Sequence, residues 1–199
     1  MNPMKKFLIF LFFSAFAFAQ KDLASAEKFQ AELNQSYADS LKSPLMKEDF
    51  KSFKGLDFFP LNEKYIVEAT FIRTKKEKAF GMKTTTSRTP LYVKYGELHF
   101  TIDGKNLKLN VYKNIDLSKK SGYEDYLFLP FSDLTCGKES YIGGRYVDMK
   151  VQKGKTWIID FNKAYNPYCA YNYEYSCPIV PLENDLDVEI LAGVKKFHD

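Results

Sequence analysis

The sequence predicts a mainly β fold: a single antiparallel β-barrel or sandwich-like domain with one or two N-terminal helices. Two observations lead to this prediction. Apolar residues recur with helical spacing before Pro60, and they alternate with polar residues after it. The alternating segments are short and have no long helix between them, which argues against a parallel sheet built from βαβ units. Antiparallel strands that close, or nearly close, into a barrel or a sandwich fit this pattern.

Residues 1–19 have the layout of a secretory signal peptide. Two lysines precede an apolar run from Phe7 to Phe18, and this run ends in the small-residue cleavage site Ala17-Phe18-Ala19. The run is too short to cross a membrane, because a spanning helix needs about 20 apolar residues. We therefore expect export to the periplasm or the medium, cleavage near Ala19, and no transmembrane segment in the cleaved chain.

Residues 20–60 are predicted to form an N-terminal helical segment that caps the β domain. Between Asp22 and Leu41, apolar residues recur every four positions among polar ones, which places them on one face of a helix. A shorter helix is expected from Lys47 to Phe53. The sequence Gly55 to Pro60 then interrupts the helical pattern.

Residues 61–199 are predicted to form the antiparallel β domain. Residues 65–72 alternate in polarity, as expected of a strand with one buried face. Asp103-Gly104 lies between two alternating runs and predicts a tight hairpin, because glycine readily adopts the positive φ that such turns need. The other strands are expected at residues 91–95, 98–102, 107–111, 126–131, 145–151, 156–161 and 188–191.

Charge and histidine content exclude several classes of function. The net charge is only +4, and the one basic run, residues 73–78, is interrupted by Glu77. A nucleic-acid-binding surface needs clustered positive charge, so we expect no nucleic-acid partner. The chain has two histidines, His99 in a predicted strand and His198 near the C-terminus. Neither is accompanied by the ligand spacing of a metal site, so no metal and no cofactor are expected.

Two blocks of sequence resemble the signatures of the domain-of-unknown-function 1684 family. The first runs from Pro130 to Tyr146 and contains Gly143-Gly144-Arg145, and the second runs from Asp160 to Asn184. The resemblance extends from about Leu41 to the C-terminus. It implies a fold and a cluster of candidate residues, and it implies no assigned activity.

The second block concentrates tyrosines and cysteines. Five of the fourteen tyrosines fall between Tyr165 and Tyr175, close to Cys169 and Cys177. In an oxidising compartment we expect these two cysteines to form a disulfide, which would stabilise the fold by roughly 2.5 kcal/mol for a loop of this size. Proteins that resemble this chain but lack an export signal carry the same pair, so buried thiols are the alternative. Cys136 is expected to be free.

The candidate ligand-binding residues come from both blocks. If they form a site, Arg145 binds a carboxylate or phosphate through its two-pronged guanidinium group. In the structural alternative, Asp133 and Asp160 cap turns and Arg145 forms an ion pair with one of them. The complete set is Asp133, Glu139, Tyr141, Arg145, Asp160, Asn162, Tyr165, Asn166, Tyr171, Glu183 and Asn184.

Two classes of function fit these residues. The favoured one is an exported β domain that binds a small molecule or an envelope protein through its aromatic-rich face. The alternative is a hydrolase or lyase that works without histidine, using carboxylates and Arg145.

Overall fold

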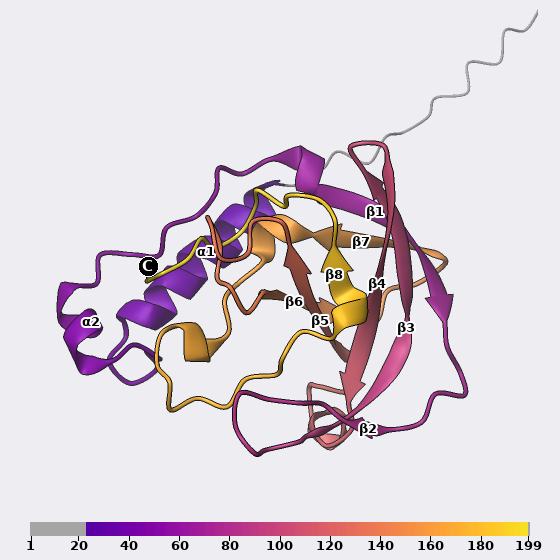
Figure 1. Cartoon of the computed structure of the whole chain (residues 1–199), viewed down its shortest axis with the longest axis horizontal. Helices are drawn as coiled ribbons and strands as arrows, with labels where there is room; N and C mark the ends of the chain where they lie inside the picture. The colour runs from indigo at the N-terminus through magenta and orange to yellow at the C-terminus, as the bar shows by residue number, and fades with distance from the viewer. Residues whose placement is uncertain (1–22, 199) are drawn as a thin grey trace, which may run out of the picture.

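A computed structural model of the chain describes residues 23–198, so the expected signal peptide, residues 1–19, lies outside the described part. The described residues form two N-terminal helices and one strongly curved antiparallel sheet, a half-barrel (Figure 1). The mainly β, antiparallel fold class predicted from the sequence is confirmed. No helix among residues 23–198 is long and apolar enough to cross a membrane.

The two helices are α1, Leu23–Ala38, and α2, Lys47–Ser52, close to the predicted ranges. Helix α1 lies against the segment that follows the last long strand of the sheet. The rings of Phe29 and Tyr165 lie 6.4 Å apart, and those of Tyr37 and Tyr171 lie 5.0 Å apart in an edge-to-face arrangement. The apolar face of α1 therefore covers part of the barrel wall.

The sheet has eight strands. In sequence order these are β1 (Ile66–Arg73), β2 (Phe80–Gly81), β3 (Leu91–Ile102), β4 (Lys105–Asn114), β5 (Tyr126–Asp133), β6 (Arg145–Lys150), β7 (Thr156–Asp160) and β8 (Asp185–Leu186). Their spatial order is β6-β5-β4-β3-β1-β7, while β2 pairs with β3 and the short β8 pairs in parallel with β5. Single-turn 3-10 helices span Glu63–Tyr65, Leu117–Lys119, Phe161–Lys163, Tyr168–Ala170 and Leu182–Asn184.

The two edges of the half-barrel meet through the segment after β7. Tyr165 pairs with Tyr146 of β6 in an antiparallel bridge. The backbone N–H of each residue donates to the carbonyl oxygen of the other, at 2.9 and 3.0 Å. Because β7 and β6 are the outer strands of the sheet, this bridge links the two edges of the half-barrel at one point.

Glycines explain two features of the sheet. Asp103 and Gly104 have φ values of 51° and 74°, which confirms the predicted hairpin between β3 and β4. The two strands predicted at residues 91–95 and 98–102 form one strand, β3, with a bulge beside Gly96. A Cβ atom at Gly96 would lie 2.3 Å from the ring of Phe71, so only glycine lets this ring pack over the bulge.

The strand predicted at residues 188–191 was wrong. The pattern there reflects alternating burial, because Val188 and Ile190 point into the core while Glu189 is exposed. The Leu134 N–H donates to the Val188 carbonyl, but residues 188–191 are not part of any strand. The guanidinium group of Arg145 binds the carbonyl of Ile190 instead. At Ile190, a side chain thus takes the place of a neighbouring strand as the hydrogen-bond donor.

Buried apolar residues form three clusters. The largest fills the half-barrel and includes Trp157, Leu98 and Phe131. The second lies among α1, α2 and the C-terminal segment. The third contains Met82, Tyr92, Tyr112, Phe128 and Tyr146. Several rings of this third cluster also line the aromatic pocket described below.

Candidate functional site

Arg145 and Asp133 form an ion pair in the protein interior. The side chains of both residues are 0% exposed, and Nη2 of Arg145 lies 2.5 Å from Oδ2 of Asp133. The guanidinium group also donates to the carbonyls of Ala192 and Ile190 at 2.5 and 2.8 Å. The Thr135 N–H donates to Oδ1 of Asp133 at 2.7 Å. These contacts fit the structural alternative, since Arg145 ties the C-terminal segment to the barrel and is closed to solvent.

Three candidate asparagines are buried and clamp the backbone of distant segments. The side-chain amide of Asn162 exchanges two hydrogen bonds with the backbone of Asn62, at 2.9 and 3.0 Å. The side chain of Asn184 does the same with the backbone of Asn110. The Asn166 side chain donates to a backbone carbonyl in the C-terminal segment. Their hydrogen bonds connect parts of the fold to one another.

The remaining candidates are dispersed. Asp160 caps a 3-10 turn by accepting from the Asn162 N–H, as the structural alternative expected. Glu139 and Glu183 are exposed on different loops, and Tyr171 is buried against α1. Of the complete candidate set, Tyr165 alone lines the pocket described next.

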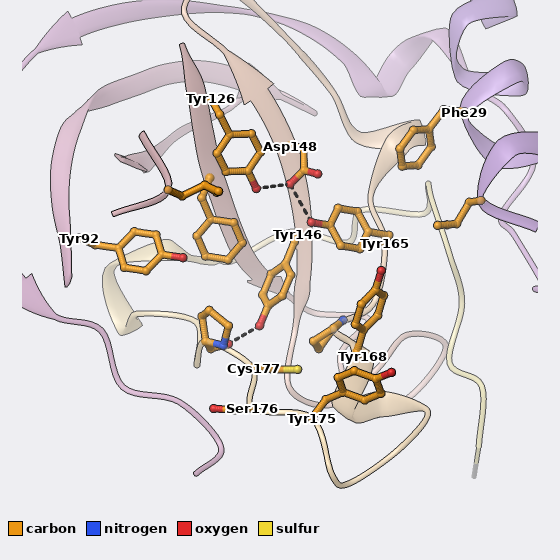
Figure 2. Close-up of a pocket in the computed structure, with 15 residues that line it drawn as sticks. Phe29, Tyr92, Tyr126, Tyr146, Asp148, Tyr165, Tyr168, Tyr175, Ser176 and Cys177 are labelled. Atoms are coloured by element: carbon orange, nitrogen blue, oxygen red, sulfur yellow. Dashed lines mark hydrogen bonds between the residues drawn. The ribbon is translucent and has the colours of Figure 1, made fainter. Parts of the chain in front are cut away.

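An aromatic pocket of about 380 Å³ opens where the edges of the half-barrel meet. Such a volume lies within the usual range of small-molecule sites, about 300–1,000 Å³. Figure 2 shows tyrosine side chains from several strands and from the loop after β7 gathered around it. Its lining residues are Phe29, Leu33, Tyr92, Leu117, Tyr126, Phe128, Tyr146, Asp148, Tyr165, Pro167, Tyr168, Tyr175, Ser176, Cys177 and Pro178.

Asp148 of β6 is the polar centre of this pocket. Its Oδ1 atom accepts hydrogen bonds from the hydroxyls of Tyr126, at 2.6 Å, and Tyr165, at 2.7 Å (Figure 2). The residue as a whole is exposed, although protein surrounds the carboxyl group on most sides. This partial enclosure raises the pKa of Asp148, and the two hydroxyl donors offset the shift only in part.

The tyrosine hydroxyls at Asp148 are held in their protonated form. Burial, followed by the charge of Asp148, raises the pKa of Tyr126 and Tyr165 far above the ordinary value. A third hydroxyl, that of Tyr146, donates to the carbonyl of Pro178. All three rings are thus fixed by polar contacts as well as by packing, so the pocket is largely preformed.

The predicted disulfide between Cys169 and Cys177 is not formed in the structure, where all three cysteines are free thiols. The backbone N–H of Cys169 instead donates to Sγ of Cys177 at 3.1 Å. A hydrogen bond from the Cys177 thiol lowers the pKa of Cys169 to about 6. Tyr141, another candidate residue, lies with its hydroxyl 3.9 Å from Sγ of Cys169. Cys177 itself lines the aromatic pocket.

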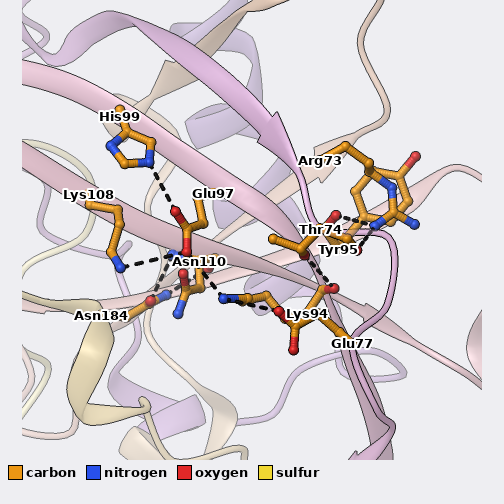
Figure 3. Close-up of polar contacts among 10 residues, drawn as sticks. All are labelled: Arg73, Thr74, Glu77, Lys94, Tyr95, Glu97, His99, Lys108, Asn110 and Asn184. Carbon is orange, nitrogen blue, oxygen red and sulfur yellow. Dashed lines mark hydrogen bonds and ion pairs between the residues drawn. The ribbon is translucent and has the colours of Figure 1, made fainter.

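The two histidines lie away from this pocket. His99 bonds through Nε2 to Glu97 at 3.1 Å, in a cluster of charged side chains on β3 and β4 (Figure 3). Lys94 and Lys108 complete this cluster around the Glu97 carboxylate. Within residues 23–198, no group of three His, Cys, Asp or Glu side chains is arranged to hold a metal ion.

Sequence reasoning missed most of the pocket residues, Asp148 above all. Asp148 alternates with buried Val147 and Met149 in β6, so its position looks like an ordinary solvent-facing one. The signal that could have indicated the pocket was the spacing of aromatic residues on β5 and β6. Tyr126 and Phe128 of β5 share a face, and Phe128 pairs in register with Asp148.

The fold and the pocket define a half-barrel domain with an aromatic cavity at its seam. A family model described as "Protein of unknown function (DUF1684)" matches residues 51–195, so the chain belongs to this family. The resemblance stated from the two sequence blocks is therefore confirmed.

Among the solved structures to which the chain is similar is one that matches over most of both chains. It is the solution NMR structure of an uncharacterized protein of Haloarcula marismortui, with 31% sequence identity and a TM-score of 0.68. The similarity covers 86% of this chain and 92% of that one. No curated protein matches the chain.

Proposed function

We propose that this protein is an exported domain that binds a small organic molecule in the aromatic pocket. The observation that carries the proposal is a preformed cavity of about 380 Å³ with aromatic walls and one solvent-accessible carboxylate, Asp148. Small-molecule sites combine these features: mostly apolar walls and a few convergent polar groups. A concave pocket of this volume favours a small molecule over a flat protein surface as its occupant.

Export is supported by the sequence of residues 1–19, with its two lysines, apolar run and Ala17-Phe18-Ala19 site. In an oxidising compartment we propose that Cys169 and Cys177 join in a disulfide. The 3.1 Å contact between the Cys169 N–H and Sγ of Cys177 supports this pairing, since it places the two residues side by side. The bond would fix the loop that forms one wall of the pocket.

The geometry gives less support to a hydrolase or lyase built on Arg145. A substrate must touch the groups that act on it, and the side chains of Arg145 and Asp133 are both 0% exposed. Their hydrogen bonds go to each other, to Thr135 and to backbone carbonyls.

A pocket-filling variant tests the proposed function. Leu117 lines the pocket, so Leu117→Trp should fill part of it. Leu41 is 93% exposed and does not line the pocket, so Leu41→Trp is a matched control with the same change of residue. The measurement is a ligand-observed NMR screen of small aromatic fragments against the cleaved chain, followed by chemical-shift mapping on labelled protein.

We expect fragments that shift the resonances of pocket residues, and weaker binding of the same fragments by Leu117→Trp. The Leu41→Trp control should bind like the unmodified protein. A screen without hits at the pocket, or hits that Leu117→Trp leaves unchanged, would refute the proposal.

A further inference from the structure

The charge inside the aromatic pocket is unbalanced. Asp148 is the one Asp, Glu, Lys or Arg among the residues that line it. Arg88, which contacts the lining residue Ser176, donates to the Ser176 carbonyl at 2.8 Å and does not itself line the pocket. The groups that influence the pKa of Asp148 are the enclosing protein and the hydroxyls of Tyr126 and Tyr165, and no cation is among them. Within residues 23–198, the pocket thus holds a carboxylate among aromatic rings and no basic side chain that would balance its charge.

One oxygen of this carboxylate is available to a ligand. Both tyrosine hydroxyls donate to Oδ1 of Asp148. Among the described residues, no hydrogen bond or ion pair is made to Oδ2, and both dashed lines at Asp148 in Figure 2 end on the other carboxylate oxygen. A carboxylate accepts several hydrogen bonds, so Oδ2 has unused capacity for a donor that enters the pocket.

The rings around Asp148 suit a positive charge. Tyr165 stands nearly perpendicular to Tyr146, at 87° with centroids 5.8 Å apart. Phe128 meets Tyr146 edge to face at 4.7 Å. Rings set at steep angles present both faces and edges to the same space. The negative faces of Tyr and Phe rings attract cations, and the attraction grows when the cation is removed from water.

We propose that the ligand of this pocket is an organic cation, a protonated amine that donates an N–H to Oδ2 of Asp148 and packs its apolar body among the surrounding rings. This inference rests on the proposed function and specifies the class of its ligand. An anionic ligand would be repelled by the Asp148 carboxylate, and a neutral ligand would leave that carboxylate without a positively charged partner.

Three matched compounds test the proposal: 2-phenylethylamine, 2-phenylethanol and 3-phenylpropionate. They share a phenyl ring on a short chain and differ in the charge of the end group. An alkyl amine, like a lysine side chain with a pKa of about 10.4, is protonated at pH 7. Titrations followed by NMR on the unmodified protein and on Asp148→Asn compare the three. Asp187→Asn is the control, because it removes the same charge from a side chain that is 84% exposed and outside the pocket.

We expect the amine to bind at least about tenfold more tightly than the alcohol, and the propionate to bind most weakly. Asp148→Asn should remove the preference for the amine and leave binding of the alcohol unchanged, whereas Asp187→Asn should change neither. Equal binding of amine and alcohol, or an amine preference that survives Asp148→Asn, would overturn the inference while pocket binding stands. Absence of binding by all three would also overturn it, and the fragment screen decides the proposed function separately.

Discussion

Replacing Arg145 with alanine is expected to destabilise the fold severely. The change would leave the fully buried Asp133 carboxylate with Thr135 as its remaining partner, and it would remove the donor that binds the Ile190 and Ala192 carbonyls. Removing one partner of a buried ion pair costs about 3–5 kcal/mol. Because the free energy of unfolding of a domain is only about 5–15 kcal/mol in total, this loss is a large fraction of the stability.

The assay is urea unfolding at pH 7, followed by the fluorescence of Trp157, the one tryptophan of the chain, which is buried in the core. Arg145→Lys should be less harmful, at about 2 kcal/mol, because an ammonium group cannot bind the carboxylate and both carbonyls with the same geometry. The double variant Arg145→Met, Asp133→Leu should recover much of the loss, since it leaves no unpaired charge in the interior.

The control is Arg73→Ala. Arg73 lies on the surface, 3.8 Å from the ring centroid of Tyr95 (Figure 3), so its loss should cost no more than about 1 kcal/mol. Hydrogen exchange adds a local measurement. Arg145→Ala should speed the exchange of the backbone amides of residues 188–194 more than that of the amides in the barrel strands. A cost below about 1 kcal/mol for Arg145→Ala, with unchanged exchange there, would refute the structural role assigned to Arg145.

Three further predictions concern single sites. Asp148→Asn should raise the thermal stability at pH 7, because the raised pKa of Asp148 means that folding disfavours its charged form. This gain in stability should disappear as the pH falls below the usual pKa of an aspartate, where the carboxyl group is neutral in both states. A gain that is the same at every pH would contradict the prediction. Gly96→Ala should cost about 1–3 kcal/mol in urea unfolding, because its Cβ would meet the Phe71 ring at 2.3 Å, and a neutral change would show that the ring can move. In reduced protein at pH 7, alkylation should modify Cys169 first, since its pKa is about 6. In exported protein, thiol counting should find Cys169 and Cys177 oxidised to a disulfide. Three free thiols in the exported protein would exclude that disulfide.

Most of the fold could be predicted because its signals are local. The alternation along residues 65–72 and the Asp103-Gly104 turn depend on near neighbours in sequence, and both predict the structure correctly. The strand at residues 188–191 failed because alternation reports burial and does not identify the hydrogen-bond partner. There the partner of Ile190 is the Arg145 side chain, more than 40 residues away in sequence, which no local pattern reveals.

The candidate site was harder to predict because family signatures mix residues that hold the fold with residues that touch a ligand. Buried groups such as Arg145, Asn162 and Asn184 satisfy the backbone of distant segments, so replacing any of them would leave buried polar atoms without partners. Asp148 differs from them: its carboxylate lines a pocket, and burial raises its pKa while the two tyrosine hydroxyls offset the shift only in part. A carboxylate that faces an aromatic cavity, with one oxygen that bonds to no described residue, is better explained by what it binds than by what it holds together. For this reason the functional argument rests on Asp148, and the stability argument rests on Arg145.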